Sequence, residues 1–532
     1  MPSTRLADDV RLSRGGAAAM PGRAPHRVRI VDALALLAFL TLVAIGAATH
    51  ELAHDEAQAW NIARTARWPW QVPFLNRYEG HPPFWTVLLW PFTLTGDPRW
   101  LQGFSAVLAA SAVALLLLDG PFPARVRLLV PFGAYPLYDY AVLARPYGMA
   151  LVVAALLATV LRRGSGRLLV PAVLCGVLAA TSAFGIVLSV PLAAFAYVEC
   201  ARRRPPPVRE IALACFVYGG LALAAGLAVL LPVVTNEFEQ TMRAGERVRP
   251  SAVWLTAATN AFPHFRTLPF GLGQRLWQTP ALYAAVTGVG VLAFVAVGVR
   301  LRAAPHALAA WVVAALGTAG LAAYTSTTEE RYLGHVFVAA LTLLWATDAS
   351  RGPARVRTRP DRAADALLVA VLIYHALIGA ASIGYDVLNE RTPWRRAAAT
   401  IGPVLEDDGA VVLNDYGYAA VTLLAWLDRP AVDLDCGGCV TRFSRWDVVE
   451  RADRRHLRAS WCALERRGQP VVAITPSERF ADVPGVQSIG EWGPGQRDWQ
   501  PRSAKALRLV DPSALCAPGA GPARTRGPTG EG

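Results

Sequence analysis

The stretch Ile30–Ala48, IVDALALLAFLTLVAIGAA, decides the fold class of this 532-residue chain. A helix of about 19 apolar residues is long enough to cross the hydrocarbon core of a bilayer. Arginines crowd the segment before it, at Arg5, Arg11, Arg14, Arg23, Arg27 and Arg29. Basic residues beside a span stay in the cytoplasm, and no clean cleavage site follows. We therefore interpret this stretch as an uncleaved first span with a cytoplasmic N-terminus.

The overall composition agrees with a membrane protein. Apolar residues make up 54% of the chain and charged residues 17%, against about 25% charged in soluble domains. Mean hydropathy is +0.33 and the formal net charge is +13. A basic chain can bind nucleic acid, but here the apolar excess is the stronger signal. These values exclude a disordered or fibrous chain, and they predict membrane lipids and no nucleic acid as partners.

Further apolar runs bring the expected number of spans to about eleven. Arginine clusters fall on alternate connections, as the positive-inside rule requires. The long run Leu168–Cys200 has arginines at both ends, so it must be a hairpin that turns near residues 181–185. The run Pro82–Thr95 is short and contains Pro91, so we interpret it as an interfacial helix. The remaining predicted spans are Leu101–Leu118, Leu128–Leu143, Met149–Leu161, Ile211–Val234, Pro280–Val299, Ala307–Tyr324, Tyr332–Ala346 and Ala363–Ile383.

The predicted fold class is an α-helical polytopic membrane protein with a C-terminal extracytoplasmic α/β domain. Residues 1–29 form the cytoplasmic tail, and residues 30–384 form the membrane domain with an outer loop at 50–100. An odd number of spans places residues 385–516 outside, and residues 517–532 are a Pro/Gly-rich disordered tail. Helices and strands alternate in the outer domain. The expected helices are Thr392–Leu405, Tyr418–Leu427 and Arg454–Arg467, and the expected strands are Ala410–Leu413, Val471–Thr475 and Ala506–Val510.

Four cysteines fall in the predicted outer domain, at Cys436, Cys439, Cys462 and Cys516. An even number of cysteines in an oxidising compartment indicates two disulfides, and three connectivities remain open. The CGGC sequence could also serve a redox site or a zinc site.

The outer loop at 50–100 gathers the polar side chains that could perform chemistry. Asp55 and Glu56 open a helical stretch beside His54, and Glu79 and His81 precede two prolines that turn the chain back toward the membrane. Acidic residues at the membrane boundary are costly and tend to be functional, although acids at a helix N-terminus also simply favour the helix dipole. These ligand types suit a divalent metal, but the spacing is loose, so a metal remains an open alternative.

Two arginines lie at the outer boundary, against the positive-inside trend. Arg145 stands beside Tyr147, and Arg331 stands beside Tyr332. Each could bind a phosphate, or each could simply reach toward lipid headgroups. His264 lies in the longest outer loop between spans, which either covers a substrate cavity or is a solvated loop.

Several motifs occur in an order that resembles the GT-C membrane glycosyltransferases. The branch is the one that contains protein O-mannosyltransferases and bacterial aminoarabinose transferases. The resemblance covers residues 30–420. Its motifs are HDEAQAW, EGHPPFWTVLLWPF, WLQGFSAVLAA, YAVLARPYGMALVVAAL, TSAFG, RYLGHVFVAAL and, after the last span, RTPWRRAAATIGPVLEDDGAVVL.

This resemblance implies an inverting enzyme of the bacterial plasma membrane. It would take a sugar from a polyprenyl-phosphate donor and transfer it to an extracytoplasmic acceptor. Asp55 would be the general base with Glu56 as its neighbour, and burial near lipid and Glu56 would raise the pKa of Asp55.

The other carried-over residues would surround that base. Arg145 and Arg331, with Tyr147 and Tyr332, would bind the donor phosphate. His54, Glu79, His81 and His264 would line the acceptor site. The chain departs from the usual pattern around Glu79 and at Ala183-Phe184, where relatives often carry histidine, so the acceptor and any metal stay open.

Two other functions compete with this prediction. A flippase or transporter of lipid-linked glycans would favour charged residues in the middle of spans, whereas polarity here gathers at the outer boundary. A non-catalytic relative could bind lipid-linked glycan or anchor the C-terminal domain. The presence of both Asp55 and Arg145 favours the enzyme.

Overall fold

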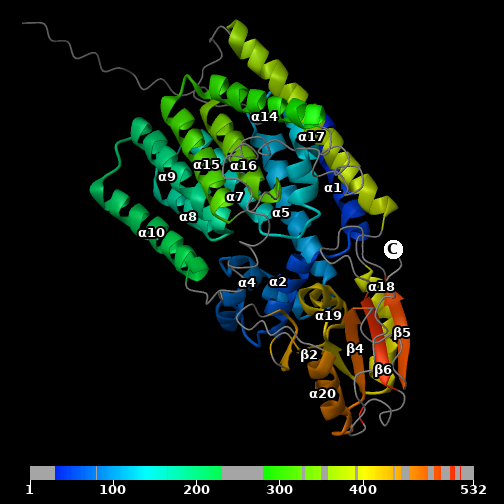
Figure 1. Ribbon diagram of the computed structural model, residues 1–532. Coiled ribbons are helices and arrows are strands. Elements are labelled where there is room, and N and C mark those ends of the chain that lie inside the picture. Colours follow the sequence, from blue (N-terminus) through cyan, green and yellow to red (C-terminus); the bar gives the residue numbers. More distant parts are fainter. Residues whose placement is uncertain are drawn as a thin grey trace, which may run out of the picture.

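The computed structural model describes residues 30–79, 81–164, 166–230, 280–325, 330–348, 358–389, 393–434, 436, 438–444, 454–476, 485–492, 504–509 and 516. Over these ranges the chain forms a helical bundle joined to a six-stranded sheet (Figure 1). The predicted tails at 1–29 and 517–532, together with His264, lie outside the described residues.

Six described helices are long and apolar enough to cross a membrane. They are α1 (Ile30–Thr49), α5 (Arg99–Asp119), α9 (Ala183–Arg203), α10 (Val208–Leu230), α15 (Pro305–Tyr324) and α17 (Arg359–Leu388). The coarse prediction of a helical membrane protein is consistent with these helices, and the count of eleven spans stays a prediction. The remaining bundle helices are α7 (Tyr147–Arg163), α8 (Leu169–Ala179), α14 (Pro280–Leu301) and α16 (Glu330–Asp348).

The predicted hairpin within 168–200 is confirmed. Helix α8 ends at Ala179 and α9 begins at Ala183, and the two helices pack against each other. The turn is fixed by Ser182, whose hydroxyl oxygen accepts a hydrogen bond from the amide of Gly185 at 2.9 Å. A serine in this place caps the first turn of α9 and lets the chain reverse within three residues.

The predicted span at 128–143 is not one continuous helix. It is divided into α6 (Ala124–Leu129), a 3₁₀ turn at Val130–Phe132 and a π-helical segment at Ala134–Asp139, followed by turns. Pro131 and Pro136 explain the division, because proline has no N–H to donate and clashes with the preceding turn. The irregular stretch brings Arg145 to the start of α7.

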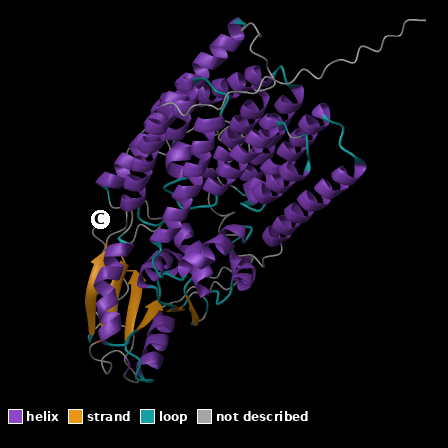
Figure 2. Ribbon diagram, turned by 180° about the vertical axis from the view of Figure 1, so that it is seen from behind, coloured by secondary structure: helices purple, strands orange, loops and turns teal. Residues whose placement is uncertain are grey.

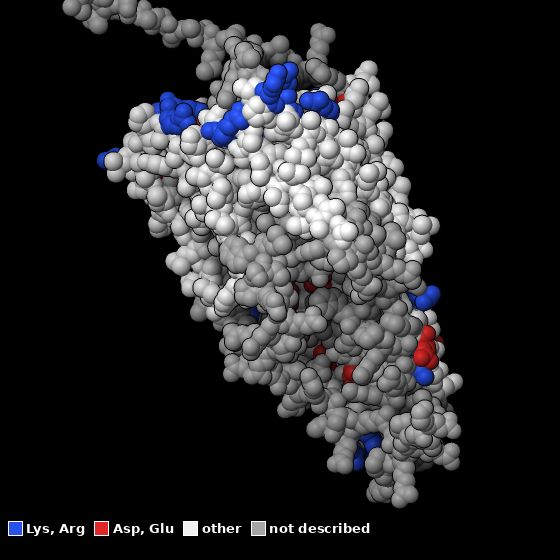
Figure 3. Space-filling model, turned by 45° about the horizontal axis from the view of Figure 1, so that its top comes forward, with Lys and Arg blue, Asp and Glu red and all other residues white. Residues whose placement is uncertain are grey.

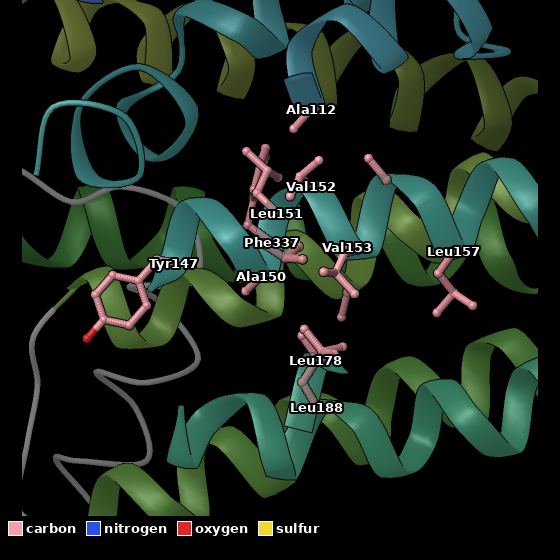
Figure 4. Packing of buried hydrophobic residues seen from close by; sticks show 14 of the residues in the cluster. Ala112, Tyr147, Ala150, Leu151, Val152, Val153, Leu157, Leu178, Leu188 and Phe337 are labelled. Carbon is pink, nitrogen blue, oxygen red and sulfur yellow. The ribbon is translucent and has the colours of Figure 1, made fainter. Parts of the chain in front are cut away.

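Helix α7 is the centre of the bundle and is buried along almost its whole length. Its alanines and glycine let α5, α8 and α16 approach closely, as small residues do between membrane helices. Figure 4 shows Leu151, Val153 and Leu157 of α7 among side chains from the surrounding helices. The packed neighbours are Ala112 of α5, Leu178 of α8, Leu188 of α9 and Phe337 of α16.

Short helices form a layer at one end of the bundle. They are α2 (His54–Thr65), α3 (Val72–Leu75) and α4 (Phe84–Thr93), with 3₁₀ turns at Pro69–Gln71 and Asn76–Tyr78. Helix α4 matches the predicted interfacial helix at 82–95 and is too short to span. Figure 1 shows this layer between the bundle and the sheet.

The C-terminal part is a three-layer α/β unit with strand order β3-β2-β1-β4-β6-β5. Central strand β1 runs parallel to β2 and β4, and the outer pairs are antiparallel. Figure 2 shows helices on both faces of the sheet. The elements are α18 (Trp394–Asp407), β1 (Val411–Asn414), α19 (Val421–Leu427), β2 (Ala431–Asp433), β3 (Cys439–Thr441), α20 (Arg454–Glu465), β4 (Val471–Pro476), β5 (Val486–Trp492) and β6 (Ala504–Leu509).

Burial explains this layering. Ile401 of α18 and Leu423 of α19 pack on Val412 and Ile474 at one face of the sheet. Trp461 of α20 packs on the opposite face. The sequence predicted α18, β1, α19, α20, β4 and β6, but missed β2, β3 and β5. Strands β2 and β3 have only three residues each, too few for an alternating pattern to stand out.

The four outer cysteines form two disulfides, as predicted, and the structure selects one of the three connectivities. Cys436 pairs with Cys439, and Cys462 pairs with Cys516. The second bridge ties α20 to the segment after β6. The disulfide between Cys436 and Cys439 leaves no free thiolates there for a zinc site.

Basic side chains gather at the end of the bundle away from the sheet (Figure 3). Ion pairs link the helix ends there, including Arg162 to Asp119 at 2.8 Å and Arg300 to Asp365 at 3.3 Å. The pattern is the one expected for the cytoplasmic ends of spanning helices.

Candidate active site

The carboxylate of Asp55 lies between two arginines. Its Oδ2 atom is 2.9 Å from Arg331 Nη1 and 3.4 Å from Arg145 Nε. Arg145 also donates from Nη1 to the backbone carbonyl of Asp55 at 2.5 Å. The Arg145 side chain is only 4% exposed, whereas those of Asp55 and Arg331 are 20% and 19% exposed. Both boundary arginines predicted from the sequence therefore converge on the predicted base.

Three separate elements position these groups. Asp55 stands in the first turn of α2, Arg331 in the first turn of α16, and Arg145 in the turn that enters α7. Arg145 stands directly before Pro146, the N-cap residue of α7, and its side chain reaches the backbone of α2. The site thus lies where the loop layer meets the bundle.

The pKa of Asp55 departs from the expectation that burial would raise it. Burial alone does raise the pKa, but Arg145, Arg331 and His54 more than offset it and hold the pKa well below its usual range. The sequence analysis also expected Glu56 to raise the pKa of Asp55. Glu56 has no such effect, because its carboxylate is directed away from Asp55. Asp55 is therefore ionised at neutral pH, and the same two ion pairs limit its basicity.

An aromatic cluster borders the arginines. Tyr332 stacks on Phe184 with ring centroids 5.1 Å apart, and Arg331 lies 5.3 Å from the Tyr332 ring. Tyr147 packs edge-on to Tyr332 and to His335, at 5.8 and 5.7 Å. The hydroxyl of Tyr147 is buried and makes no hydrogen bond within the described part of the chain. Tyr147 and Tyr332 thus stand beside the arginines, and their role in donor binding stays a prediction.

Phe184 lies at the hairpin tip, and the structure places a histidine near it. His335 of α16 accepts or donates a hydrogen bond with the Ser182 hydroxyl at 3.4 Å. Its ring lies 5.7 Å from that of Phe184. His335 belongs to the quoted motif RYLGH. The sequence could not show that it contacts Ser182, because the two residues are 153 positions apart in the chain.

Glu79 and His81 lie close enough to Asp55 and Arg145 for both charges to act on their pKa values. Burial and the charge of Asp55 raise the pKa of Glu79 to about 7, although Arg145 and a hydrogen bond from Gln58 lower it. Burial, Arg145 and Arg331 lower the pKa of His81 to about 3, so its ring is neutral at pH 7. The buried Nδ1 atom of His81 has no hydrogen-bond partner among the described residues. At pH 7 this pair therefore combines a carboxyl group whose pKa is close to the ambient pH with a neutral imidazole ring.

The sequence analysis expected Glu56 beside the Asp55 carboxylate, but the Glu56 carboxylate is directed away from it. It is fully buried, and its two oxygens accept hydrogen bonds from the amides of Ala144 and Ala53 at 2.5 and 2.6 Å. His50 Nε2 lies 2.9 Å from Glu56, and His50 Nδ1 lies 3.1 Å from Asp386. Glu56 therefore fixes α2 to the turn before Arg145.

The network continues into the bundle. Tyr138 donates its hydroxyl to Asp386 at 2.6 Å, and Gln102 donates to the carbonyl of His50 at 3.0 Å. The chain of contacts joins the end of α1 to α2, α5, the π-helical segment and the end of α17. Sequence reasoning missed His50 and Asp386, because only the packing of α17 on α1 brings them together.

His54 takes a place at the interface with the C-terminal unit. Its Nδ1 atom lies 3.4 Å from the hydroxyl of Thr422 in α19. The described residues contain no group of three or more His, Cys, Asp or Glu side chains arranged to hold a metal ion. A divalent metal at the loosely spaced residues around Asp55 therefore stays a prediction from the sequence.

Comparison with known proteins adds no relative: no family model, no curated protein and no solved structure matches this chain.

Proposed function

We propose that this chain is a membrane glycosyltransferase of the GT-C type that moves a sugar from a polyprenyl-phosphate donor to an extracytoplasmic acceptor. The observation that carries the proposal is the ionised Asp55 carboxylate held between Arg145 and Arg331. A general base and a phosphate-binding pair of guanidinium groups are the two parts that this reaction needs. The motif order of the sequence supports the same class.

In this mechanism the acceptor hydroxyl gives its proton to Asp55 while its oxygen attacks the anomeric carbon. The bond from that carbon to the phosphate oxygen breaks, and its electron pair leaves with the polyprenyl phosphate. Attack opposite the leaving group inverts the anomeric configuration. The phosphate gains negative charge as it leaves, and Arg145 and Arg331 stabilise that charge.

The same arginines explain how Asp55 can become an effective base. In the free protein both guanidinium groups neutralise its carboxylate. A donor phosphate competes for the two groups, because arginine binds phosphate and carboxylate with the same planar geometry. Binding of the donor thus weakens the ion pairs of Asp55 and raises its proton affinity when the acceptor arrives.

The proposed topology has about eleven spans and the site at the outer face of a bacterial plasma membrane. It is supported by the two ends of the bundle. Basic side chains gather at the end away from the sheet (Figure 3), whereas helix α2, which carries Asp55, lies at the end toward the sheet (Figure 1). A reporter enzyme fused after Asn389 should read extracytoplasmic. A cytoplasmic reading would contradict this orientation.

Transfer can be tested with membranes that contain the full-length protein and radiolabelled polyprenyl-phosphate sugars. The wild type should move label into an endogenous acceptor, and Asp55→Asn should reduce the rate about 100- to 10,000-fold. Asp97→Asn is the matched control, because Asp97 also belongs to the outer loop but caps the amide of Arg99. Full transfer by Asp55→Asn would reject the base, and no transfer from any donor would reject the enzyme.

A further inference from the structure

Gln58 connects the candidate active site to the C-terminal unit. It is a fully buried residue of α2. Its Nε2 atom donates to the carbonyl of Ser444 at 2.8 Å, and its Oε1 atom accepts from the amide of Ser444 at 2.9 Å. Both bonds cross from the outer loop to the segment after β3.

The same amide also reaches Glu79. A primary amide has two N–H donors, so one can bind Ser444 while the other donates to the Glu79 carboxylate. The hydrogen bond from Gln58 favours the ionised form of Glu79. Since both polar atoms of the Gln58 side chain are held by one backbone residue, its position depends on that residue.

We propose that Gln58 is a positioning residue that transmits the docking of the C-terminal unit at Ser444 to the Glu79 carboxyl. Glu79 is the group that it acts upon, and Gln58 itself touches no substrate. The role of Glu79 in transfer rests on the function proposed above. The link itself is a property of the folded protein and can be measured without any transfer.

The contact between α2 and the C-terminal unit also provides a matched control. Asn61 lies on the same helix, is also buried, and donates from Nδ2 to the carbonyl of Val421 in α19 at 2.9 Å. It thus makes the same type of bond between the same two parts of the chain. No described contact joins Asn61 to Glu79, so its loss weakens docking without removing a bond from that carboxyl.

The test measures the protonation of Glu79 in the full-length protein in detergent micelles. Dicyclohexylcarbodiimide adds to protonated carboxyl groups in apolar surroundings, and peptide mass spectrometry quantifies the modified Glu79. The wild type should show a labelling midpoint near pH 7. In Gln58→Leu the midpoint should rise by about one pH unit, because a hydrogen bond that favours the charged form is lost.

Two further variants keep the result decisive. Gln58→Asn keeps the amide on a shorter side chain and replaces Gln58→Leu in the test if that variant folds poorly. It should also raise the labelling midpoint. Asn61→Leu should leave the midpoint unchanged. Equal shifts in the Gln58 and Asn61 variants, or no shift in either, would overturn the inference. Because labelling needs no sugar transfer, that result is distinct from failure of the proposed function.

An independent observation concerns the opposite end of the bundle. An open apolar groove lies between α6, α14, α16 and α17. Its walls include Phe337, Leu341 and Leu368, and its rim carries Arg125, Arg300 and Asp365. The groove is shallow and open along one side, so it suits an extended acyl chain better than a compact ligand.

We infer that this groove binds an anionic phospholipid, with an acyl chain along the apolar wall and the phosphate at Arg125 and Arg300. Two arginines against one aspartate leave the rim positive. Asp365 lies 3.3 Å from Arg300, so it fixes that arginine at the rim. Arg125 is exposed at the start of α6 and can turn toward a headgroup.

Native mass spectrometry of the full-length protein from nanodiscs with equal phosphatidylglycerol and phosphatidylcholine tests this site. The wild type should retain phosphatidylglycerol preferentially, and Arg125→Gln should lower that preference about five-fold. Arg163→Gln is the control, because its side chain is 70% exposed and outside the groove. Equal retention of both lipids by the wild type, or an equal loss in the control, would overturn the inference.

Discussion

The Oδ2 atom of Asp55 and the Nη1 atom of Arg331 lie 2.9 Å apart, and Arg145 approaches the same oxygen. One carboxylate oxygen thus occupies the place where two guanidinium groups could hold a phosphate oxygen. The arrangement gives the arginines two anionic partners, one in the protein and one in the proposed donor. Variants of either arginine should therefore change both donor binding and the basicity of Asp55.

Replacing Arg331 by Gln should weaken donor binding and shift the pH dependence of transfer. The arginine favours the ionised carboxylate and lowers the pKa of Asp55, so its loss raises that pKa. The acidic limb of the pH profile should move to higher pH, and kcat/KM for the donor should fall about 10- to 100-fold. Steady-state kinetics from pH 2 to pH 8 measure both effects, with the wild-type limb at the acidic end of that range because the pKa of Asp55 lies well below its usual value.

Arg64→Gln controls for loss of any arginine near α2. Arg64 pairs with Asp428 at 2.8 Å and takes no part in the Asp55 cluster. The Arg64→Gln variant should therefore leave the acidic limb of the pH profile in place. An unchanged limb in Arg331→Gln as well would show that Arg331 does not set the basicity of Asp55.

Much of this site could be predicted from the sequence, because its two arginines are exceptions to the rule that basic residues stay on the cytoplasmic side of a membrane. Apolar runs and arginine placement are constrained by a bilayer, so Arg145 and Arg331 stood out because the predicted topology puts them at the outer boundary. His50 and Asp386 carry no such signal, since each is an ordinary polar residue near the end of a helix. Their contact arises from how α17 packs on α1, which periodicity along the chain does not encode.

The direction of the Asp55 pKa shift was mispredicted for a related reason. Adjacent residues at the start of a helix point in different directions, about 100° apart. Glu56 therefore faces the turn at Ala144 while Asp55 faces the arginines. A sequence pattern places both acids at one helix end but does not say what each side chain meets.

Replacing Glu56 by Gln should destabilise the protein more than replacing Asp55 by Asn. Both Glu56 oxygens accept backbone hydrogen bonds, and a Gln amide nitrogen cannot accept one. One buried N–H is left unpaired, which costs about 1–3 kcal/mol. Size-exclusion chromatography after stepwise heating in detergent should show the lower unfolding temperature. Equal stability of the two variants would mean that Glu56 does not hold α2 in place.

Asp428→Asn should loosen the C-terminal unit from α2 in a pH-dependent way. Asp428 binds Arg64 and Arg442, each at 2.8–2.9 Å. Burial alone would raise the pKa of Asp428, but the two arginines lower it below the ordinary value of 3.8. The stabilisation is therefore present above about pH 4 and is lost as pH falls through the folded-state pKa.

Asparagine tolerates the left-handed backbone at this position, where φ is +49°, so the substitution tests the charge alone. Because Asp428 is about one-third exposed, the cost at pH 7 should be about 0.5–1 kcal/mol. Limited proteolysis of the connection between α17 and α18 should be faster in the variant at pH 7. The difference between the wild type and the variant should shrink as the pH is lowered stepwise below 4, and a difference that stays constant down to pH 2 would rule out the ion pairs as its cause.

Removing the Cys462–Cys516 disulfide should destabilise the C-terminal unit more than removing Cys436–Cys439. The first bridge spans 54 residues and the second spans three. Loop-closure entropy in the unfolded chain then predicts losses of about 4 and about 1.5 kcal/mol. Double Cys→Ala variants of each pair, unfolded in urea and followed by tryptophan fluorescence, would measure the difference. The Trp461 side chain is the natural reporter, because it is buried beside Cys462 against the sheet. If the short-range pair cost as much as the long-range one, the effect would come from packing at the cysteines instead of from constraint of the unfolded chain.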